Sequence, residues 1–410
     1  MKIHLSFLIV PFLLLSSTAQ AAGPARSLLP ARSTDQVPAQ LQAPTLDKAS
    51  TATLDRRPVA MSWAIDAQAP LDARPTPFEQ RSREYWIDAS GAQLQRGLPL
   101  STSATGALIR LSPHAGNRGT LDIATLGIRA NGKLFASTEA LRTAADEDAL
   151  RAAGMDVPQG SVVVKLADAV GFGAIELIAP AASGDWLVHV FEPASRIVMT
   201  LRADRDTALA GQPIRFRAAV EGGAALDGLD GLLNSPDGHV QDVHFTRQAD
   251  GSFLATVQAD AAHAGGFGLW EIHAFGNASA RGISVPRDAR NAFAVSVASA
   301  RFNGSIETIA APAKEAGLVL RVGVESASAS RYQLAGVLYG RRTDGSLGPA
   351  VMAHSAAWLE AGNGSIDLRI DAGALRASGA SAPYELRDLR LINQADMSLI
   401  ERRERAAVVF

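Results

Sequence analysis

Apolar and polar residues alternate over short segments through much of the chain beyond residue 195. Two alternating runs, at residues 197–202 and 214–218, flank the turn-forming Gly211-Gln212-Pro213. Further runs of this kind follow at residues 240–245, 253–257, 269–275 and 292–297. Period-two alternation broken by turn residues is typical of a seven-stranded immunoglobulin-like (Ig-like) sandwich. We therefore predict an Ig-like β-sandwich over residues 195–301.

Part of this pattern occurs a second time. Residues 251–260 are echoed by residues 364–372, and residues 269–275 by residues 383–389, with apolar side chains at alternate positions. Each pair is predicted to supply the fifth and sixth strands of a sandwich, with Trp270 and Tyr384 as aromatic plugs between the sheets. A second sandwich is predicted over residues 302–410.

The region before residue 195 predicts a further β-rich domain, at residues 82–194. Residues 84–88 and 94–100 are expected to form two strands around a glycine-containing turn, and more strands are expected at residues 107–111, 127–130, 162–166, 174–178 and 186–191. One helix is expected at residues 137–153, with Ser137 or Thr138 as N-cap and Gly154 as its stop. The predicted fold class is all-β, with tandem Ig-like antiparallel β-sandwiches and one short helical insertion in the first domain.

The N-terminus has the order of a secretory signal peptide. Lys2 precedes an apolar run over residues 5–15, and the small-residue triplet Ala19-Gln20-Ala21 follows. This order predicts a signal peptide at residues 1–21, cleaved after Ala21, and hence an exported chain that is periplasmic or secreted. The alternative, a membrane anchor, would need roughly twenty apolar residues. Residues 22–81, rich in Pro, Ala and Ser, are predicted to be a largely irregular linker with one piece around Trp63 docked on a neighbouring domain.

Composition narrows the possible functions. The chain has no cysteine, which excludes disulfides, thiolate nucleophiles and sulfur-ligated zinc. The formal net charge is −2 with no basic stripe, so nucleic acid is not an expected partner. No later segment is long and apolar enough to predict a transmembrane segment.

Several runs in the chain resemble one uncharacterised family. They are residues 82–88, 188–195, 338–340 and 383–391. Together they look like a family of gammaproteobacterial exported proteins with Ig-like modules, domain of unknown function 4785. The resemblance implies this architecture and export for most of the mature chain. It implies no activity, because none of these runs is a catalytic motif.

Metal and cofactor chemistry has only weak candidates. Asp242 and His244 share one strand face and Glu271 and His273 share another, so four ligands could meet if the two strands were adjacent. The alternative is a solvated outer face. The acidic residues around Asp227 have some character of a calcium loop, but ordinary turn chemistry explains them better. No cofactor is predicted, and calcium stays as the alternative.

Aromatic residues offer one further clue. The five tryptophans are scattered, which indicates core plugs rather than a platform for carbohydrate. Tyr85 and Trp86 are adjacent, so strand alternation must turn one of the two rings outward. His189 lies in a strand that is apolar on both faces and is expected to be a half-buried, hydrogen-bonded imidazole.

Standard catalytic motifs, such as H-E-x-x-H, G-x-S-x-G and the P-loop, do not occur in the sequence. We therefore expect an exported, non-catalytic binding or interaction protein that recognises an unknown protein or an envelope or surface ligand. Two alternatives stay open. One is a secreted hydrolase with an unrecognised site in the N-terminal domain, and the other is a structural module of a surface or secretion assembly.

Overall fold

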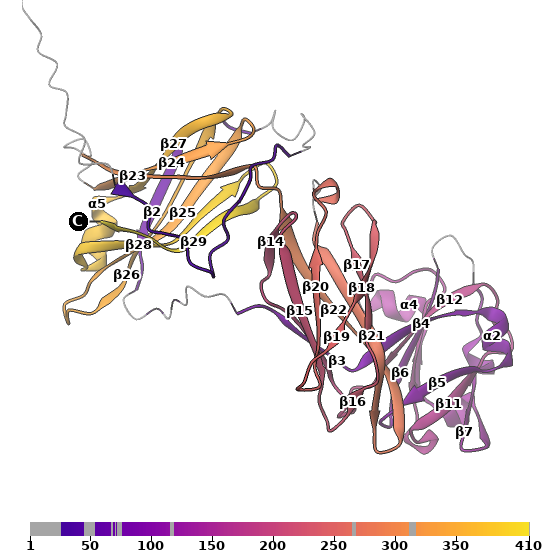
Figure 1. Ribbon diagram of the computed structural model, residues 1–410. Helices are drawn as coiled ribbons and strands as arrows, with labels where there is room; N and C mark the ends of the chain where they lie inside the picture. The colour runs from indigo at the N-terminus through magenta and orange to yellow at the C-terminus, as the bar shows by residue number, and fades with distance from the viewer. Residues whose placement is uncertain are drawn as a thin grey trace, which may run out of the picture.

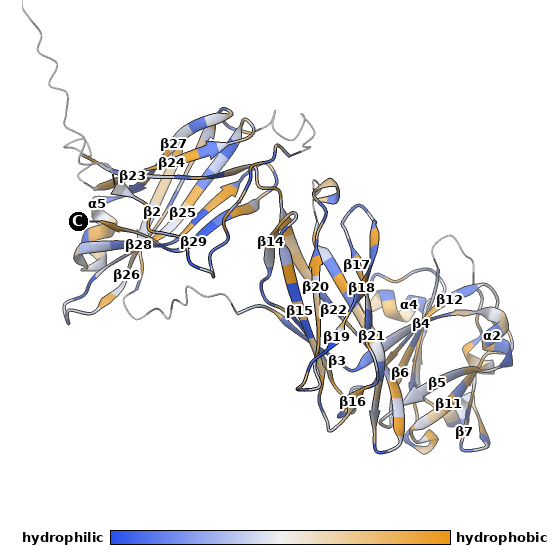
Figure 2. Cartoon of the chain, in the orientation of Figure 1, coloured by the Kyte–Doolittle hydropathy of each residue, from blue (hydrophilic) through white to orange (hydrophobic). Residues whose placement is uncertain are grey.

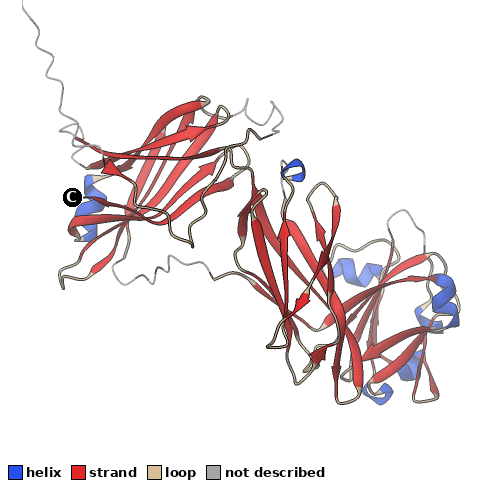
Figure 3. Cartoon of the chain, in the orientation of Figure 1, coloured by secondary structure: helices blue, strands red, loops and turns tan. Residues whose placement is uncertain are grey.

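The structure is a computed structural model that describes residues 26–44, 54–66, 69, 71, 76–114, 119–264, 268–310 and 317–409. The predicted signal peptide and its cleavage after Ala21 lie outside these residues. Strands dominate the described chain (Figure 3), and antiparallel sheets build three domains in a row (Figure 1). The predicted all-β class is confirmed. Within the described ranges, no helix has both the length and the hydropathy needed to cross a bilayer.

The first domain packs two sheets face to face. One sheet contains β4 (Glu84–Ser90), β12 (Asp185–Phe191), β6 (Leu108–Pro113), β10 (Val162–Leu166) and β9 (Leu141–Ala145) in that order. The other contains β5 (Leu98–Thr102), β11 (Gly173–Ile178), β7 (Gly127–Ala130) and β8 (Lys133–Ala136). The short 3-10 helices are η1 (Ile123–Thr125) and η2 (Asp168–Val170).

The single helix predicted at residues 137–153 is wrong. Two short helices, α3 (Ser137–Ala140) and α4 (Glu147–Ala152), flank β9, which pairs with β10. Residues 141–145 form a strand instead of a helix because the edge of β10 offers hydrogen-bond partners to their backbone groups. Asp146 caps α4 by accepting the Ala149 N–H. The predicted stop at Gly154 is right, since this residue adopts a left-handed φ of 83° just beyond α4.

The strand predicted at residues 94–100 begins too early, because α2 (Gly91–Arg96) occupies its first half. Ser90 and Gln93 form a reciprocal capping box that starts this helix. Gly91 allows a close approach, since a Cβ there would lie 2.7 Å from the Ser183 Cα. Among its described residues, the first domain therefore contains three short α-helices rather than one insertion.

The middle domain has the strand order of an Ig-like sandwich. Its first sheet contains β3 (Glu79–Ser82), β13 (Met199–Ala203), β15 (Pro213–Val220), β20 (Phe253–Gln258) and β19 (Thr246–Arg247). Its second contains β18 (Val240–His244), β17 (Asp230–Asn234), β21 (Trp270–Ala280) and β22 (Ile283–Ser296). Short β14 (Thr207–Leu209) pairs with β22, β16 (Ala225–Leu226) pairs with β21, and η3 is Ala261–His263. Hydrophobic and hydrophilic residues alternate along these strands (Figure 2).

The third domain repeats this plan. Its first sheet contains β1 (Arg26–Ser27), β23 (Ala300–Ala310), β24 (Leu318–Ser326) and β27 (Gly362–Ile370). Its second contains β2 (Val59–Ala64), β26 (Leu347–Leu359), β25 (Ser330–Arg341), β28 (Ser381–Asn393) and β29 (Ser398–Val409), and α5 spans Ala372–Ser378. The echoed segments occupy matching places, with β20 and β27 in the first sheets and β21 and β28 in the second.

The segment expected to be a linker contributes edge strands to both sandwiches. Trp63 lies in β2, which pairs with β26 of the third domain, and β3 pairs with β13 of the middle domain. Nearer the N-terminus, β1 pairs with β23, and Gln36 forms a bridge with Arg402. The third domain is therefore assembled from both ends of the described chain.

The hydrophobic core of the first two domains is continuous, whereas the third domain has its own. At the junction, Glu84 of β4 pairs with Asp288 of β22, which joins both domains in one eleven-stranded sheet. On the inner side of this junction, Arg287 and Glu192 are 0% and 1% exposed and lie 2.6 Å apart. The Arg287 guanidinium also donates to Ser195 Oγ and to the Ile197 carbonyl. A fully buried ion pair thus connects the two domains.

Candidate functional site

The sheet opens where β4 meets β22. Only Glu84 and Asp288 are paired between these strands. Pro286, two residues before Asp288, has no N–H to continue the ladder. The Asp288 carboxylate instead accepts the Trp86 N–H through Oδ2 at 2.9 Å. The strands therefore diverge. A cavity lies on each face of β4, and Pro286 lines both cavities.

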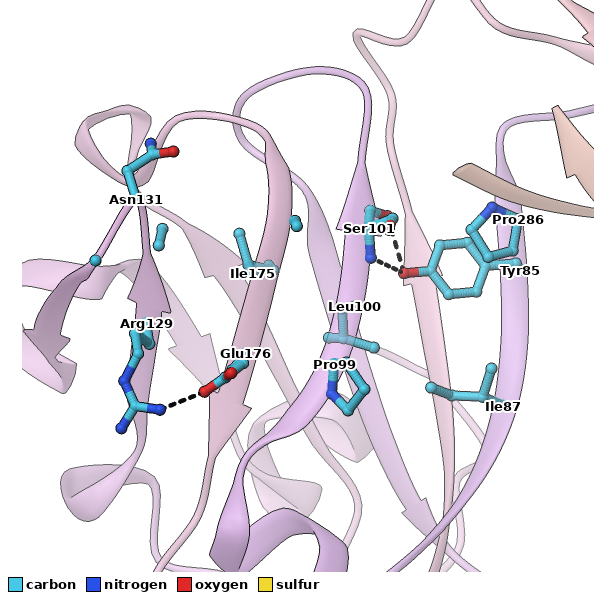
Figure 4. Close-up of a pocket in the computed structure, with 13 residues that line it drawn as sticks. Tyr85, Ile87, Pro99, Leu100, Ser101, Arg129, Asn131, Ile175, Glu176 and Pro286 are labelled. Atoms are coloured by element: carbon cyan, nitrogen blue, oxygen red, sulfur yellow. Dashed lines mark hydrogen bonds and ion pairs between the residues drawn. The ribbon is translucent and has the colours of Figure 1, made fainter. Parts of the chain in front are cut away.

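The first cavity, of about 370 Å³, lies beside the four-stranded sheet of the first domain (Figure 4). The Tyr85 hydroxyl accepts the Ser101 N–H and donates to the Ser101 carbonyl at 2.9 Å. Burial raises the pKa of Tyr85, which keeps this phenol neutral. Arg129 forms an ion pair with Glu176 across the opposite wall. The Tyr85 hydroxyl and the Arg129–Glu176 pair therefore already have partners within the cavity wall.

The second cavity has a volume of about 360 Å³, and we call it the Trp86 cavity. Unlike the first, it contains a buried polar side-chain atom without a hydrogen-bond partner in the described chain. It is lined by Trp86 of β4, by His273, Phe275, Gly276 and Asn277 of β21, and by Pro286 and Asp288 of β22. Alternation places Tyr85 in the core and Trp86 on the outer face of the same strand. The cavity combines aromatic walls with imidazole, amide and carboxylate groups.

Neighbouring strands hold the Trp86 ring in place. The His189 ring stacks on it at 4.6 Å with an interplanar angle of 7°, and the Arg290 guanidinium lies 4.4 Å from the ring centroid. Because β12 and β22 flank β4, these two groups cover opposite faces of the ring. His189 is fixed in turn, since its Nε2 lies 2.8 Å from Glu84 Oε2.

Asp288 is the most buried acid of the cavity, at 5% exposure. Its Oδ2 also lies 3.3 Å from His273 Nε2, but this contact lacks hydrogen-bond geometry and leaves the buried nitrogen without a hydrogen bond. Asp288 Oδ1 accepts no hydrogen bond from the residues that the structure describes. A carboxylate oxygen and an imidazole nitrogen are thus available at the cavity.

The four metal-ligand candidates do not meet. Asp242 and His244 lie on β18 and Glu271 and His273 on β21, but β17 runs between these strands. The two pairs are therefore about 9.5 Å apart or more across the sheet. Within the described ranges, no three His, Cys, Asp or Glu residues form a group that could hold a metal ion. A four-ligand site required β18 and β21 to be adjacent, and they are not.

The acidic residues considered for calcium make local hydrogen bonds instead. Asp227 accepts the Ser279 hydroxyl at 2.8 Å, and Asp230 opens strand β17. Asp237 accepts hydrogen bonds from the Ser235 hydroxyl and from His263, which hold the pKa of this carboxyl well below its usual range. These contacts are those of turns and strand ends.

The aromatic residues follow the sequence predictions only in part. One ring of the Tyr85–Trp86 pair faces outward, as predicted, and Trp186 and Trp270 are core plugs. The core-plug prediction is wrong for Trp63, which is 46% exposed, for Trp86, which lies on the outer face, and for Trp358, which is only half-buried. His189 is the half-buried, hydrogen-bonded imidazole expected.

Sequence reasoning missed Asp288 and Arg290. Their strand was predicted to begin at residue 292, whereas β22 begins at Ile283. One signal in the sequence could have shown an outer face. It is the placement of four residues at alternate positions: Ser284, Pro286, Asp288 and Arg290.

The fold and site define an all-β protein of three sandwich domains with a ligand-sized cavity where the first two join. Family models match in two places. The "Domain of unknown function (DUF4785) N-terminal domain" matches residues 50–192, and the "DUF4785 C-terminal domain" matches residues 299–409. The chain belongs to the DUF4785 family, as the resemblance in the sequence indicated.

A solved DUF4785 family protein from Legionella pneumophila has the same fold. The two chains are 20% identical, the match covers 93% of this chain and 98% of the other, and the TM-score is 0.72. Trypsin-activated alpha-2-macroglobulin from Escherichia coli matches at 12% identity over 74% of this chain and 22% of its own length. Its TM-score of 0.19 carries no argument about the fold. No curated protein matches the chain.

Proposed function

We propose that this chain is an exported, non-catalytic binding protein and that its ligand occupies the Trp86 cavity. The observation that carries this proposal is the outward Trp86 ring at the edge of a cavity that holds a buried carboxylate with a free oxygen. Its volume of about 360 Å³ is within the usual range for small-molecule sites. Aromatic walls with a few convergent polar groups are typical of such sites.

Binding explains the cavity better than hydrolysis does. Asp288 is the one carboxylate among the described residues that line it, and these residues include no hydroxyl or thiol. Hydrolysis through a serine, threonine or cysteine nucleophile needs such a group beside its base, and glycoside hydrolysis canonically uses two carboxylates. One oxygen of Asp288 accepts the Trp86 N–H. The cavity therefore lacks the groups of these two hydrolytic mechanisms, whereas its aromatic and polar groups suit the binding of a ligand.

Ligand binding can be tested by thermal-shift screening of the mature chain against a small-molecule library. A ligand at 100 times its Kd should stabilise the first two domains by about 2.7 kcal/mol. Trp86→Leu should abolish the shift, because it removes the aromatic wall. Trp63→Leu is the matched control, since Trp63 is exposed on the third domain and should not affect binding. A shift of equal size in Trp86→Leu would contradict the site.

Export is supported by the N-terminal sequence, and fractionation of a Gram-negative host that expresses the tagged full-length chain tests it. We expect the periplasmic or extracellular form to begin at Ala22. In Ala21→Arg the cleavage site is disrupted, so the uncleaved precursor should accumulate. Full-length chain that stays in the cytoplasm of the unmutated control would refute export.

A further inference from the structure

We infer that the ligand of the Trp86 cavity is a small organic cation, whose ammonium or guanidinium group binds over Trp86 in place of Arg290 and pairs with Asp288. This inference rests on the proposed function and specifies the chemistry of its ligand.

The charge around the cavity favours a cation. Three carboxylates contact Trp86 or its neighbours: Glu84 lies against His189, Glu271 against Arg290 and Asp288 against the Trp86 N–H. The described residues that line the cavity include no arginine or lysine. Asp288 is nearly fully buried, and its Oδ1 has no donor within the described chain. A buried carboxylate is costly unless a cation or several donors satisfy it. An anionic ligand would instead meet this carboxylate and be repelled.

The ring face of Trp86 is already a cation site. The Arg290 guanidinium lies 4.4 Å from the ring centroid, which is within the usual distance for a cation–π contact. Phe275 adds a second aromatic group to the wall, next to the His273 ring at 5.5 Å. Arg290 makes no ion pair with Asp288 and does not line the cavity. A ligand cation that displaces Arg290 from the ring therefore lies nearer the cavity, between the Trp86 ring and the free Asp288 oxygen.

Arg290 has another position available. Its Nε lies 3.8 Å from Glu271 Oε1, and its side chain is 41% exposed. Rotation toward Glu271 would retain an ion pair while uncovering the Trp86 face. The exchange keeps the Arg290–Glu271 pair and adds one positive charge, that of the ligand, for Asp288. Arg290 therefore competes with the ligand.

The test uses isothermal titration calorimetry on the mature chain with choline and putrescine as cationic probes. The neutral control is 3,3-dimethylbutan-1-ol, which has the shape of choline without its charge. At least one cation should bind with an affinity about tenfold or more above that of the alcohol, since the cation–π contact and the carboxylate both require charge. If neither choline nor putrescine binds more tightly than the alcohol, the inference is overturned.

Variants with opposite expected effects locate the site. Asp288→Asn should weaken cation binding about tenfold, because it removes the charge while its amide oxygen can still accept the Trp86 N–H. Arg290→Gln should strengthen binding by about threefold or more, because the competing cation is gone. Arg129→Gln, in the other cavity, should leave the affinity unchanged. Unfolding midpoints near that of the parent chain show that each variant is folded.

The outcomes separate this inference from the proposed function. A neutral ligand from the library screen that depends on Trp86, with no binding of either cation, would refute the inference and leave the proposed function standing. Cation binding that is unchanged in Trp86→Leu, Asp288→Asn and Arg290→Gln would place the cations elsewhere and refute the inference as well. If the library screen also gives no Trp86-dependent ligand, the proposed function fails with it.

Discussion

Replacing Arg287 by Met is expected to lower the free energy of unfolding of the first two domains by about 3–5 kcal/mol. The substitution leaves Glu192, which is 1% exposed, as a buried charge without its cation. It also removes the donors to Ser195 and to the Ile197 carbonyl in the middle domain, and the donor to the Ser103 hydroxyl of the first domain. Urea denaturation followed by circular dichroism measures the loss.

The double variant Glu192→Gln with Arg287→Met is the control for this explanation. It removes both charges, so part of the lost stability should return. Arg217→Met is the surface comparison, because the Arg217–Asp250 pair is more than half exposed on both sides and should cost less than about 1 kcal/mol. A loss of similar size in Arg217→Met and Arg287→Met would show that burial of the pair is not the cause.

Replacing Trp186 by Ala is expected to cost about 3–5 kcal/mol, and only in the first two domains. The Trp186 side chain is fully buried in the core that these domains share, and its Nε1–H donates to the Ser183 carbonyl at 2.9 Å. The third domain has a separate core. Calorimetry should therefore resolve two transitions, and only the transition of the first two domains should shift to lower temperature.

Leu334→Ala provides the reciprocal measurement. Leu334 is fully buried in the core of the third domain, so its loss should cost about 2–5 kcal/mol and shift only the other transition. A Trp186→Ala variant that shifts both transitions equally would show that the three domains unfold as one unit.

The parts of the fold that follow from local sequence were predicted well. In β15 and β20 of the middle domain, buried and more exposed residues alternate, so the sequence pattern placed both strands correctly. Strand β17 was missed because the Asp and Gly residues around it indicated a turn. Gly231 is needed inside that strand, since a Cβ there would lie 2.9 Å from the His273 carbonyl oxygen. The helix predicted at residues 137–153 failed because a neighbouring strand overrode local propensity.

The candidate site was only half visible in the sequence. Alternation alone showed that Tyr85 or Trp86 must face outward, and it did not show what would surround that ring. Asp288 and Arg290 reach Trp86 because β22 of the middle domain meets β4 of the first, a pairing between strands about 200 residues apart. The metal hypothesis likewise depended on the order of strands in the sheet, which local sequence does not show. It fails because β17 lies between β18 and β21.

The third domain is closed by strands from both ends of the described chain: Val59 lies opposite Ala356, and Ser27 lies opposite Ser305. A ribosome makes these early strands long before their partners exist, and each such pairing closes a very long loop. These early strands therefore stay without their partners until β23 and β26 have been made. A chain cut short before residue 347 would leave β2, with its exposed Met61 and Trp63, an edge without a neighbour and a site for aggregation.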